Sequence, residues 1–160
     1  MINKVFIYQQ LATYGERNFM MKMIKYLTLT LILLLTSCAS QPDQTIYQQL
    51  GGKEKITEIV QNFIYEIEFN ETIFEYFKDS DIQRFHDKLI EHICVHTGGP
   101  CEYTGDPMDK VHTGMHISEA DFNLTVDLLI DAMTKADVPH PLQNKVLAIF
   151  APMRGEMIYR

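Results

Sequence analysis

The sequence predicts an all-helical domain. Apolar residues recur at spacings of three and four in four stretches of the chain, which is the pattern of amphipathic helices. No stretch of useful length alternates between polar and apolar residues, so no sheet is expected. We therefore expect four long helices in two pairs, joined by short connectors around a common core. A plain four-helix bundle fits the same periodicity.

The first two helices are predicted from their apolar stripes. The first stripe consists of Ile56, Ile59, Val60, Phe63, Ile64 and Ile67. The second stripe consists of Ile82, Phe85, Leu89 and Ile93. Each stripe covers one face of a helix, and that face is expected to point to the core.

The other two helices carry start signals as well as stripes. The Ser118 hydroxyl can cap a helix at the amide near Asp121, and Pro139 and Pro141 mark the start of the last helix. The third stripe consists of Phe122, Val126, Leu129, Ile130 and Met133. The fourth consists of Leu142, Val146, Ile149, Phe150 and Met153. Pro152 is expected to kink the last helix, because it lacks the amide hydrogen that the helix needs.

The start of the chain has the build of a secretory signal. Lys22 and Lys25 precede the apolar run 27–35, which is too short to span a bilayer as a mature helix. The run ends in LTSC, which resembles a bacterial lipoprotein cleavage box, so Cys38 is the expected lipidation site. A buried hydrophobic helix that happens to end in cysteine is the alternative. The polar residues that follow favour the lipoprotein, because they provide a tether.

The lipoprotein interpretation divides the chain into four parts. Residues 1–22 are an upstream extension, since Met23 begins a signal of normal length. Residues 23–38 are the lipoprotein signal peptide, 39–45 a linker and 46–158 the folded domain. The protein is thus expected to be exported and lipid-anchored to the cell envelope. Ala39 after the cysteine predicts the periplasmic face of the outer membrane, if the sorting rules of enteric bacteria apply.

The charge of the mature part argues against nucleic acid as a partner. From Cys38 onward there are 10 Lys and Arg against 20 Asp and Glu, a formal charge of −10. Such a surface repels phosphate backbones and anionic lipid heads. The lipid, rather than a basic patch, would hold the protein at the membrane.

The segment 97–117 carries the main functional signal. It places His112 among four glycines, Gly98, Gly99, Gly105 and Gly114, which allow open turns and a close approach to a large flat cofactor. A bare histidine is more often a surface residue. His116, four residues on, forms a pair with His112 that could hold zinc, but the HExxH pattern and a third ligand are missing.

Four motifs, in order and spacing, carry a family resemblance. They are YQQLGG, TGGPCEYTG, VHTGM and APMRGEMI, between Tyr47 and Met157. With them the domain resembles the group 1 truncated haemoglobins. The resemblance implies a two-over-two helical sandwich with haem b between the pairs and His112 as the proximal iron ligand. The absence of CxxCH gives no sign of c-type attachment, so the haem is expected to bind non-covalently. The implied function is reversible binding of oxygen, nitric oxide or carbon monoxide at ferrous iron, in the oxygen-carrier class.

The resemblance also assigns the other cofactor contacts. It places Ile64, Phe85 and Leu89 at the distal positions and Phe77 against the haem, and Met108 and Met115 are expected beside the ligand segment. The best-known members have tyrosine where Ile64 stands and often glutamine where Leu89 stands, and both donate hydrogen bonds to dioxygen. The replacement by apolar residues predicts weak stabilisation of dioxygen. Tyr65 is displaced by about 100° round an ideal helix and should point elsewhere.

Lys88 and two cysteines leave alternatives open. Lys88 can pair with a haem propionate, close the sixth iron position if burial removes its proton, or remain solvated. A closed position would make the protein an electron-transfer or redox module that needs an electron donor. A haem-free helical lipoprotein acting through protein contacts is a third class. No residue set for general acid or base catalysis is evident, so enzymatic status is open. Cys94 and Cys101 can form a disulfide, act as a redox pair or remain buried thiols.

Overall fold

A computed structural model describes residues 21–23, 25, 26 and 43–160. The chain divides into two units at residue 42, and each is described by itself. In the first unit the described residues are helical. Cys38, the linker up to Pro42 and most of the predicted signal peptide lie outside the described residues. Within the part that is described, no helix is both long enough and apolar enough to cross a membrane.

The second unit is built from helices joined by turns and loops. Its elements are α2 (Ile46–Leu50), α3 (Gly52–Glu68), α4 (Glu71–Phe74), α5 (Ile82–His96), α6 (Met108–Val111), α7 (Glu119–Lys135), α8 (His140–Phe150) and a 3-10 helix η1 (Ala151–Glu156). Residues 43–160 contain no strand. The predicted all-helical class is therefore confirmed.

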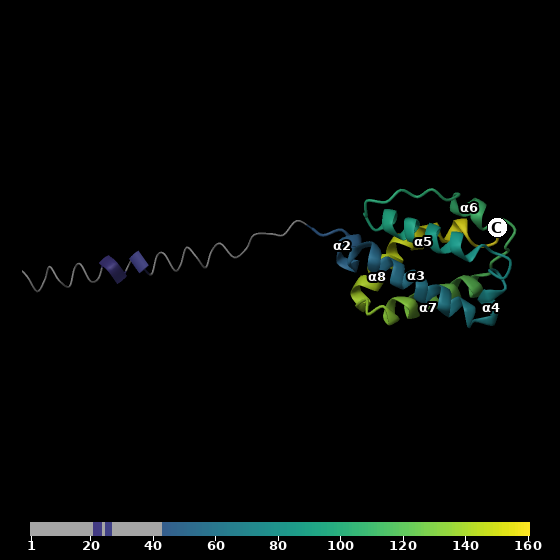
Figure 1. The fold of residues 1–160 in the computed structure, drawn as a ribbon, viewed down its shortest axis with the longest axis horizontal. Helices are drawn as coiled ribbons and strands as arrows, with labels where there is room; N and C mark the ends of the chain where they lie inside the picture. Colours follow the sequence, from purple (N-terminus) through teal and green to yellow (C-terminus); the bar gives the residue numbers. More distant parts are fainter. Residues whose placement is uncertain (1–20, 24, 27–42) are drawn as a thin grey trace, which may run out of the picture. The chain divides into compact units, whose positions relative to one another are not determined.

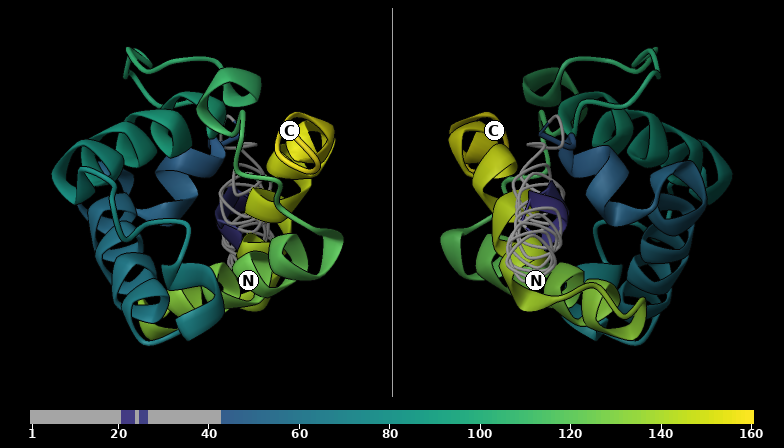
Figure 2. Two further views of the ribbon diagram at one scale, coloured as in Figure 1. Left: turned by 90° about the vertical axis from the view of Figure 1, so that its right-hand side faces the viewer. Right: turned by 90° about the vertical axis from the view of Figure 1, so that its left-hand side faces the viewer.

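The four long helices form two pairs. α3 packs against α5 on one side and against α7 on the other, and α7 also contacts α8. The pair α3 and α5 lies over the pair α7 and α8, and the short α6 lies beside α5 and close to η1 (Figures 1 and 2). This is the predicted two-over-two sandwich.

The core contains residues of all four predicted stripes together with Ile73 and Cys94 from outside them, whereas Ile82 of the second stripe is exposed. Ile56, Ile73, Met133, Val60 and Cys94 are the largest fully buried side chains. Burying an aliphatic side chain of this size contributes about 1.5–3 kcal/mol to folding. On α3 the stripe ends at the predicted positions Phe63 and Ile67, which are buried, whereas Ile64 is half-buried at the edge of the core. Because the Ile64 side chain is only partly covered, it can line a cavity.

The start of α7 matches the predicted cap. Ser118 Oγ accepts a hydrogen bond from the Asp121 amide at 3.2 Å, and the Asp121 carboxylate accepts from the Ser118 amide at 3.3 Å. This reciprocal pair satisfies two amides that a helix start leaves without partners. The same carboxylate accepts from the Tyr76 hydroxyl at 2.8 Å, which ties α7 to the residues after α4.

Pro152 changes the type of helix rather than only kinking it. α8 ends at Phe150, and the chain continues as the 3-10 helix η1. The expected α-helix through Met153 is therefore wrong, because proline supplies no amide hydrogen for the α-helical bond and 3-10 turns commonly take over at helix ends. The chain then returns to the predicted ligand segment. The His116 amide donates to the Arg160 carbonyl, and the Tyr159 amide donates to the Ile117 carbonyl, both at 3.0 Å.

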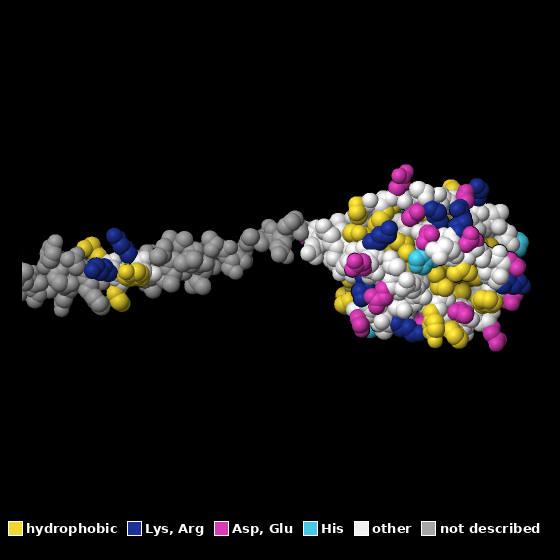
Figure 3. Space-filling model, viewed as in Figure 1, with side chains coloured by type: hydrophobic (Ala, Val, Ile, Leu, Met, Phe, Trp, Pro, Cys, Tyr) yellow, Lys and Arg dark blue, Asp and Glu magenta, His cyan; other side chains and the backbone are white. Residues whose placement is uncertain are grey.

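The surface mixes both signs of charge. Asp and Glu side chains are spread over the face in view, with Lys and Arg between them (Figure 3). Pairs such as Lys78 with Glu75, at 2.7 Å, are largely exposed. Exposed pairs of this kind contribute about 0–1 kcal/mol each, so they do not decide the fold.

Candidate functional site

His112 directly follows the single turn of α6. Its side chain is half-buried, and Nδ1 lies 2.7 Å from the Met108 carbonyl oxygen. A carbonyl oxygen only accepts hydrogen bonds, so Nδ1 carries a proton, and in the neutral ring the lone pair then lies on Nε2. A neutral imidazole oriented through one nitrogen, with the other free, is the usual form of a metal-ligating histidine.

The segment around His112 is short and sharply bounded. Pro107 precedes α6, and Gly114 at φ 83° turns the chain away two residues after His112. Any residue with a Cβ is strained at that φ, which gives this glycine a conformational role. His112 thus lies at the end of one helical turn, as the C-terminal cap of α6.

His116 does not join His112 in a metal site. It is exposed, has φ 52°, and its amide bonds to the C-terminal Arg160. Among the described residues, no group of three or more His, Cys, Asp or Glu side chains could hold a metal ion. The His112–His116 zinc alternative therefore gains no structural support.

An apolar cavity of about 280 Å³ lies among α3, α4 and α5. Its lining residues are Ile64, Ile67, Glu68, Phe74, Phe77, Ile82 and Phe85. Three predicted cofactor contacts, Ile64, Phe77 and Phe85, are thus brought together from three segments. The rings of Phe77 and Phe85 lie 4.8 Å apart and form one aromatic wall. The lining does not include the other predicted contacts Leu89, Met108 and Met115, which are half-buried.

Tyr65 points away from this cavity, as its displacement round the helix predicts. Its side chain is 52% exposed and packs on Phe69, with ring centroids 4.6 Å apart. The Lys135 ammonium lies 4.8 Å from the centre of its ring. The described lining of the cavity therefore holds no tyrosine hydroxyl.

Lys88 is engaged by neighbouring polar groups. Its Nζ donates to the two carboxylate oxygens of Glu91 at 2.8 and 3.0 Å and also to the Thr104 hydroxyl. The Thr104 amide donates to Glu91 at 2.9 Å, so the carboxylate links α5 to the loop before α6. The Lys88 ammonium and then the Thr104 amide lower the pKa of Glu91 to about 2. Lys88 is therefore held at the edge of α5 by a charged partner.

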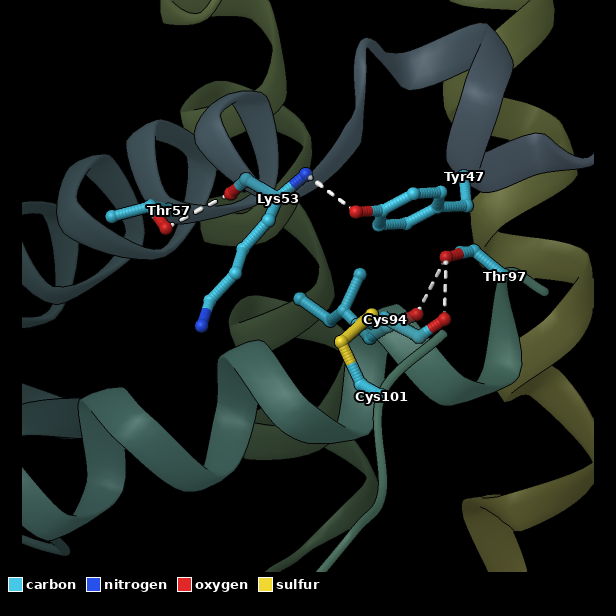
Figure 4. Close-up of a disulfide and its surroundings, with 7 residues drawn as sticks. Tyr47, Lys53, Thr57, Cys94, Thr97 and Cys101 are labelled. Carbon is cyan, nitrogen blue, oxygen red and sulfur yellow. Dashed lines mark hydrogen bonds between the residues drawn. A yellow bond between two sulfur atoms is a disulfide. The ribbon is translucent and has the colours of Figure 1, made fainter. Parts of the chain in front are cut away.

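Cys94 and Cys101 form a disulfide at the end of α5. Their Cα atoms are 5.9 Å apart, and the helix ends at His96 with Thr97 as its cap (Figure 4). The Thr97 hydroxyl donates to the carbonyls of Ile93 and Cys94, which closes the helix end. A Cβ at Gly99 would lie 2.5 Å from the Tyr47 ring and 2.6 Å from Cys94 Sγ, so only glycine fits this turn. The bond fastens the start of the loop that leads to His112.

Comparison with known proteins decides the family. A family model described as bacterial-like globin matches residues 45–159. This chain belongs to the bacterial-like globins. The group 1 truncated haemoglobin GlbN of Mycolicibacterium paratuberculosis is 34% identical over 113 residues, which cover 71% of this chain and 83% of that protein. The group 1 truncated haemoglobin of Tetrahymena pyriformis is 24% identical over 115 residues, 72% of this chain and 95% of that protein.

Solved globin structures share the fold. The Fe(III) form of the truncated haemoglobin from Tetrahymena pyriformis superposes with a TM-score of 0.70 at 24% identity, covering 73% of this chain and all of that one. The two-over-two haemoglobin of Synechococcus sp. PCC 7002, solved with covalently attached haem, gives a TM-score of 0.68 at 18% identity, covering 73% of this chain and 100% of that one. These matches confirm the two-over-two fold of this globin.

His92 is a feature of this globin that the sequence analysis did not assign to the site. It is 7% exposed, and neither ring nitrogen has a hydrogen-bond partner. Its ring stacks on Phe150 at 5.4 Å and meets Tyr103 edge-on at 5.1 Å. Burial, followed by repulsion from His96 and His112, lowers the pKa of His92 to about 4, so the ring is neutral near pH 7. The available signal was its position on the apolar stripe of α5, three residues after Leu89.

Proposed function

We propose that this globin binds haem b non-covalently through His112 and reversibly binds a diatomic gas. The observation that carries the proposal is the hydrogen bond between His112 Nδ1 and the Met108 carbonyl, which leaves Nε2 free to ligate iron. Oxygen, nitric oxide and carbon monoxide are the candidate gases. Membership of the bacterial-like globins and the similarity of this chain to group 1 truncated haemoglobins support the oxygen-carrier class.

The residues around the site fit a large apolar cofactor. Haem supplies a ferrous iron that binds a diatomic gas. His112 would hold the iron through Nε2, and Ile64, Phe77 and Phe85 would offer the cofactor the apolar surface of the half-open cavity that they line. Leu89, Met108 and Met115 are assigned to the cofactor by the resemblance alone.

An open sixth iron position is favoured over the electron-transfer alternative. The Lys88 amine lies in contact with the Glu91 carboxylate and the Thr104 hydroxyl, and an ammonium group has no lone pair for iron. An electron donor is therefore not needed for the proposed function. No contact of the described residues favours the redox module over gas binding.

Replacing Lys88 with Met tests the open position. We expect the ferrous absorption spectrum and the rate of carbon monoxide association to stay within about twofold of the wild type, because the amine is already engaged elsewhere. Flash photolysis measures the rate. Lys78→Met is a matched control, since Lys78 also pairs with a glutamate, Glu75, at 2.7 Å. Faster association and loss of a six-coordinate spectrum in Lys88→Met alone would show that this lysine closes the site.

The proposed function itself is tested by haem titration of the purified haem-free protein. A Soret band that saturates at one haem per chain, and that changes when carbon monoxide is added to the reduced protein, is the expected result. Extraction into acidified butanone should remove the haem, because the proposed attachment is non-covalent. Absence of a Soret band would reject haem binding and support the alternative of a haem-free helical lipoprotein.

We further propose that the globin domain is exported and anchored by lipid on Cys38, on the periplasmic face of the outer membrane. The basic residues, the apolar run 27–35 and the LTSC end of the leader support this proposal. The charge of the mature part is consistent with a lipid anchor rather than electrostatic attachment to the membrane.

Replacing Cys38 with Ser should abolish lipidation and leave an uncleaved precursor. The reason is that the thiol is the acylated atom, whereas a serine hydroxyl at the same place is not a substrate in the proposed processing. Mass spectrometry of the mature N-terminus measures the outcome. A wild-type chain that begins with unmodified Met1 or Met23 would reject the lipid anchor on Cys38.

A further inference from the structure

We propose that Tyr159 and Arg160 are positioning residues for His112. They fasten the connector 113–117, which joins α6 to α7 and begins directly after the proposed iron ligand. The proposal deepens the proposed function and rests on it, because a fixed imidazole matters to the site only when His112 holds haem iron. It gives a role to two residues that the sequence analysis did not assign to the site.

The connector makes few hydrogen bonds. The Thr113 hydroxyl donates back to the Asp109 carbonyl of α6 at 2.7 Å, and the Met115 amide donates to the His112 carbonyl at 3.2 Å. Within residues 43–160, the hydrogen bonds of the connector to elements other than α6 and its cap His112 are both made to residues 159 and 160. These two residues therefore fasten the connector from outside.

The two outside bonds run antiparallel. The His116 amide donates to the Arg160 carbonyl, and the Tyr159 amide donates to the Ile117 carbonyl, both at 3.0 Å. The helix η1, which precedes Tyr159, also contacts α6 (Figures 1 and 2). The same part of the chain thus contacts both the helix that carries the ligand and the connector that follows it.

Backbone strain occurs on both sides of the antiparallel contact. His116 has φ 52° and Tyr159 has φ 54°, values that residues with a Cβ rarely adopt. Asp137, the third described non-glycine residue with a positive φ, lies just past the end of α7, where such a residue commonly ends a helix. Strained backbone persists only where the surrounding structure enforces it, and it gathers at functional sites. The contact between residues 116–117 and 159–160 is therefore held against a local cost.

The segment that makes this contact is itself held in place. We call residues 154–160 the strap. The Arg160 guanidinium donates to the Gly155 carbonyl through Nε at 3.1 Å and through a terminal nitrogen at 2.6 Å, which closes the strap on itself. Arg154 pairs with Glu119 at 3.1 Å and lies 5.5 Å from the centre of the Phe122 ring. Both partners are in the first turns of α7, so the strap ties the connector to a long helix.

An outside fastening matters because α6 is short. It has four residues, and one helical turn is marginal on its own. The Met108 carbonyl holds the His112 ring through Nδ1, but Met108 lies on that same turn. The strap instead relates the ligand to α7. Groups that orient a metal ligand typically change metal affinity by about 10–100-fold when they are removed.

Deletion of Tyr159 and Arg160 from the haem-loaded protein tests the positioning role. We expect haem transfer to an acceptor protein to become about 10–100-fold faster, since both outside bonds of the connector are lost. The histidine–iron stretching band of the ferrous protein should shift and broaden, because the His112 ring would adopt a range of orientations. Lys145→Met is the control. It removes an exposed cation that bonds to Gln49 at 2.8 Å, between α8 and α2, and both measurements should match the wild type.

Two substitutions at Arg160 test the strap without shortening the chain. Arg160→Met loses both side-chain bonds to the Gly155 carbonyl, so the histidine–iron band should move in the same direction as in the deletion variant, by a smaller amount. Arg160→Lys keeps a cationic donor and should bring the band back toward the wild type. A band displaced as far in Arg160→Lys as in Arg160→Met would overturn the role of this side chain.

The histidine–iron band separates positioning from support of the fold. A wild-type band in the deletion variant would overturn the proposal even if the melting temperature fell, because the strap would then only stabilise the domain. A wild-type protein without a ¹⁵N-sensitive histidine–iron band would instead reject the proposed function, and the positioning role with it.

Discussion

His112→Ala should lose stoichiometric haem binding. The variant removes the imidazole whose Nδ1 bonds to the Met108 carbonyl and whose Nε2 is proposed to hold the iron. Even groups that only orient a metal ligand typically change affinity by about 10–100-fold, so loss of the ligand itself should exceed that range. Haem titration of the purified protein, followed at the Soret band, measures the affinity.

His116→Ala is the matched control for His112→Ala. His116 is an exposed imidazole four residues away, and its contact with Arg160 is made by its backbone amide, which the variant keeps. We expect wild-type affinity and spectrum. If His112→Ala kept both while His116→Ala lost them, the iron ligand would have been placed on the wrong residue.

Loss of the disulfide should produce the largest stability change outside the haem site. Cys94 and Cys101 close a short loop, and chain entropy predicts a loss of about 2 kcal/mol when the bond is removed. For a domain of this size the melting temperature should fall by roughly 8 °C. Thermal unfolding of Cys101→Ser measures the change, and Cys94→Ser should add the cost of burying a hydroxyl.

Reduction provides the control for the cysteine variants. Dithiothreitol should lower the melting temperature of the wild type and leave that of Cys101→Ser unchanged, while the Soret spectrum is retained in both. Thiol labelling of the unreduced, unfolded protein from the cell envelope should find neither Cys94 nor Cys101 free. Two labelled thiols would show that the pair is only packed together in the cell.

Local sequence signals predicted the long helices well. The stripe from Ile56 to Ile67 and the cap formed by Ser118 and Asp121 are properties of a few neighbouring residues, so spacing alone reveals them. The one-turn helices are different. α4 depends on Asn70 capping the Ile73 amide, and such short turns carry too few apolar positions to show a period.

The site was harder to predict because it depends on contacts between distant segments. Ile64, Phe77 and Phe85 were assigned by resemblance, and the fold brings them to one cavity. The burial of His92 depends in part on Phe150, which is far away in the sequence, so residue type alone does not predict it. The sequence leaves three roles open for Lys88, because its contact with Thr104 comes from a loop sixteen residues away. Tertiary packing, rather than residue type, decides each of these roles.

The iron–nitrogen stretching band in the resonance Raman spectrum of the ferrous, gas-free protein tests the central claim most directly. The account predicts a histidine–iron band in the wild type that shifts when histidine is labelled with ¹⁵N. In His112→Gly the band should disappear and return when free imidazole is added, because imidazole can fill the space that the side chain leaves. A ¹⁵N-sensitive band that persists in His112→Gly without imidazole would contradict His112 as the iron ligand.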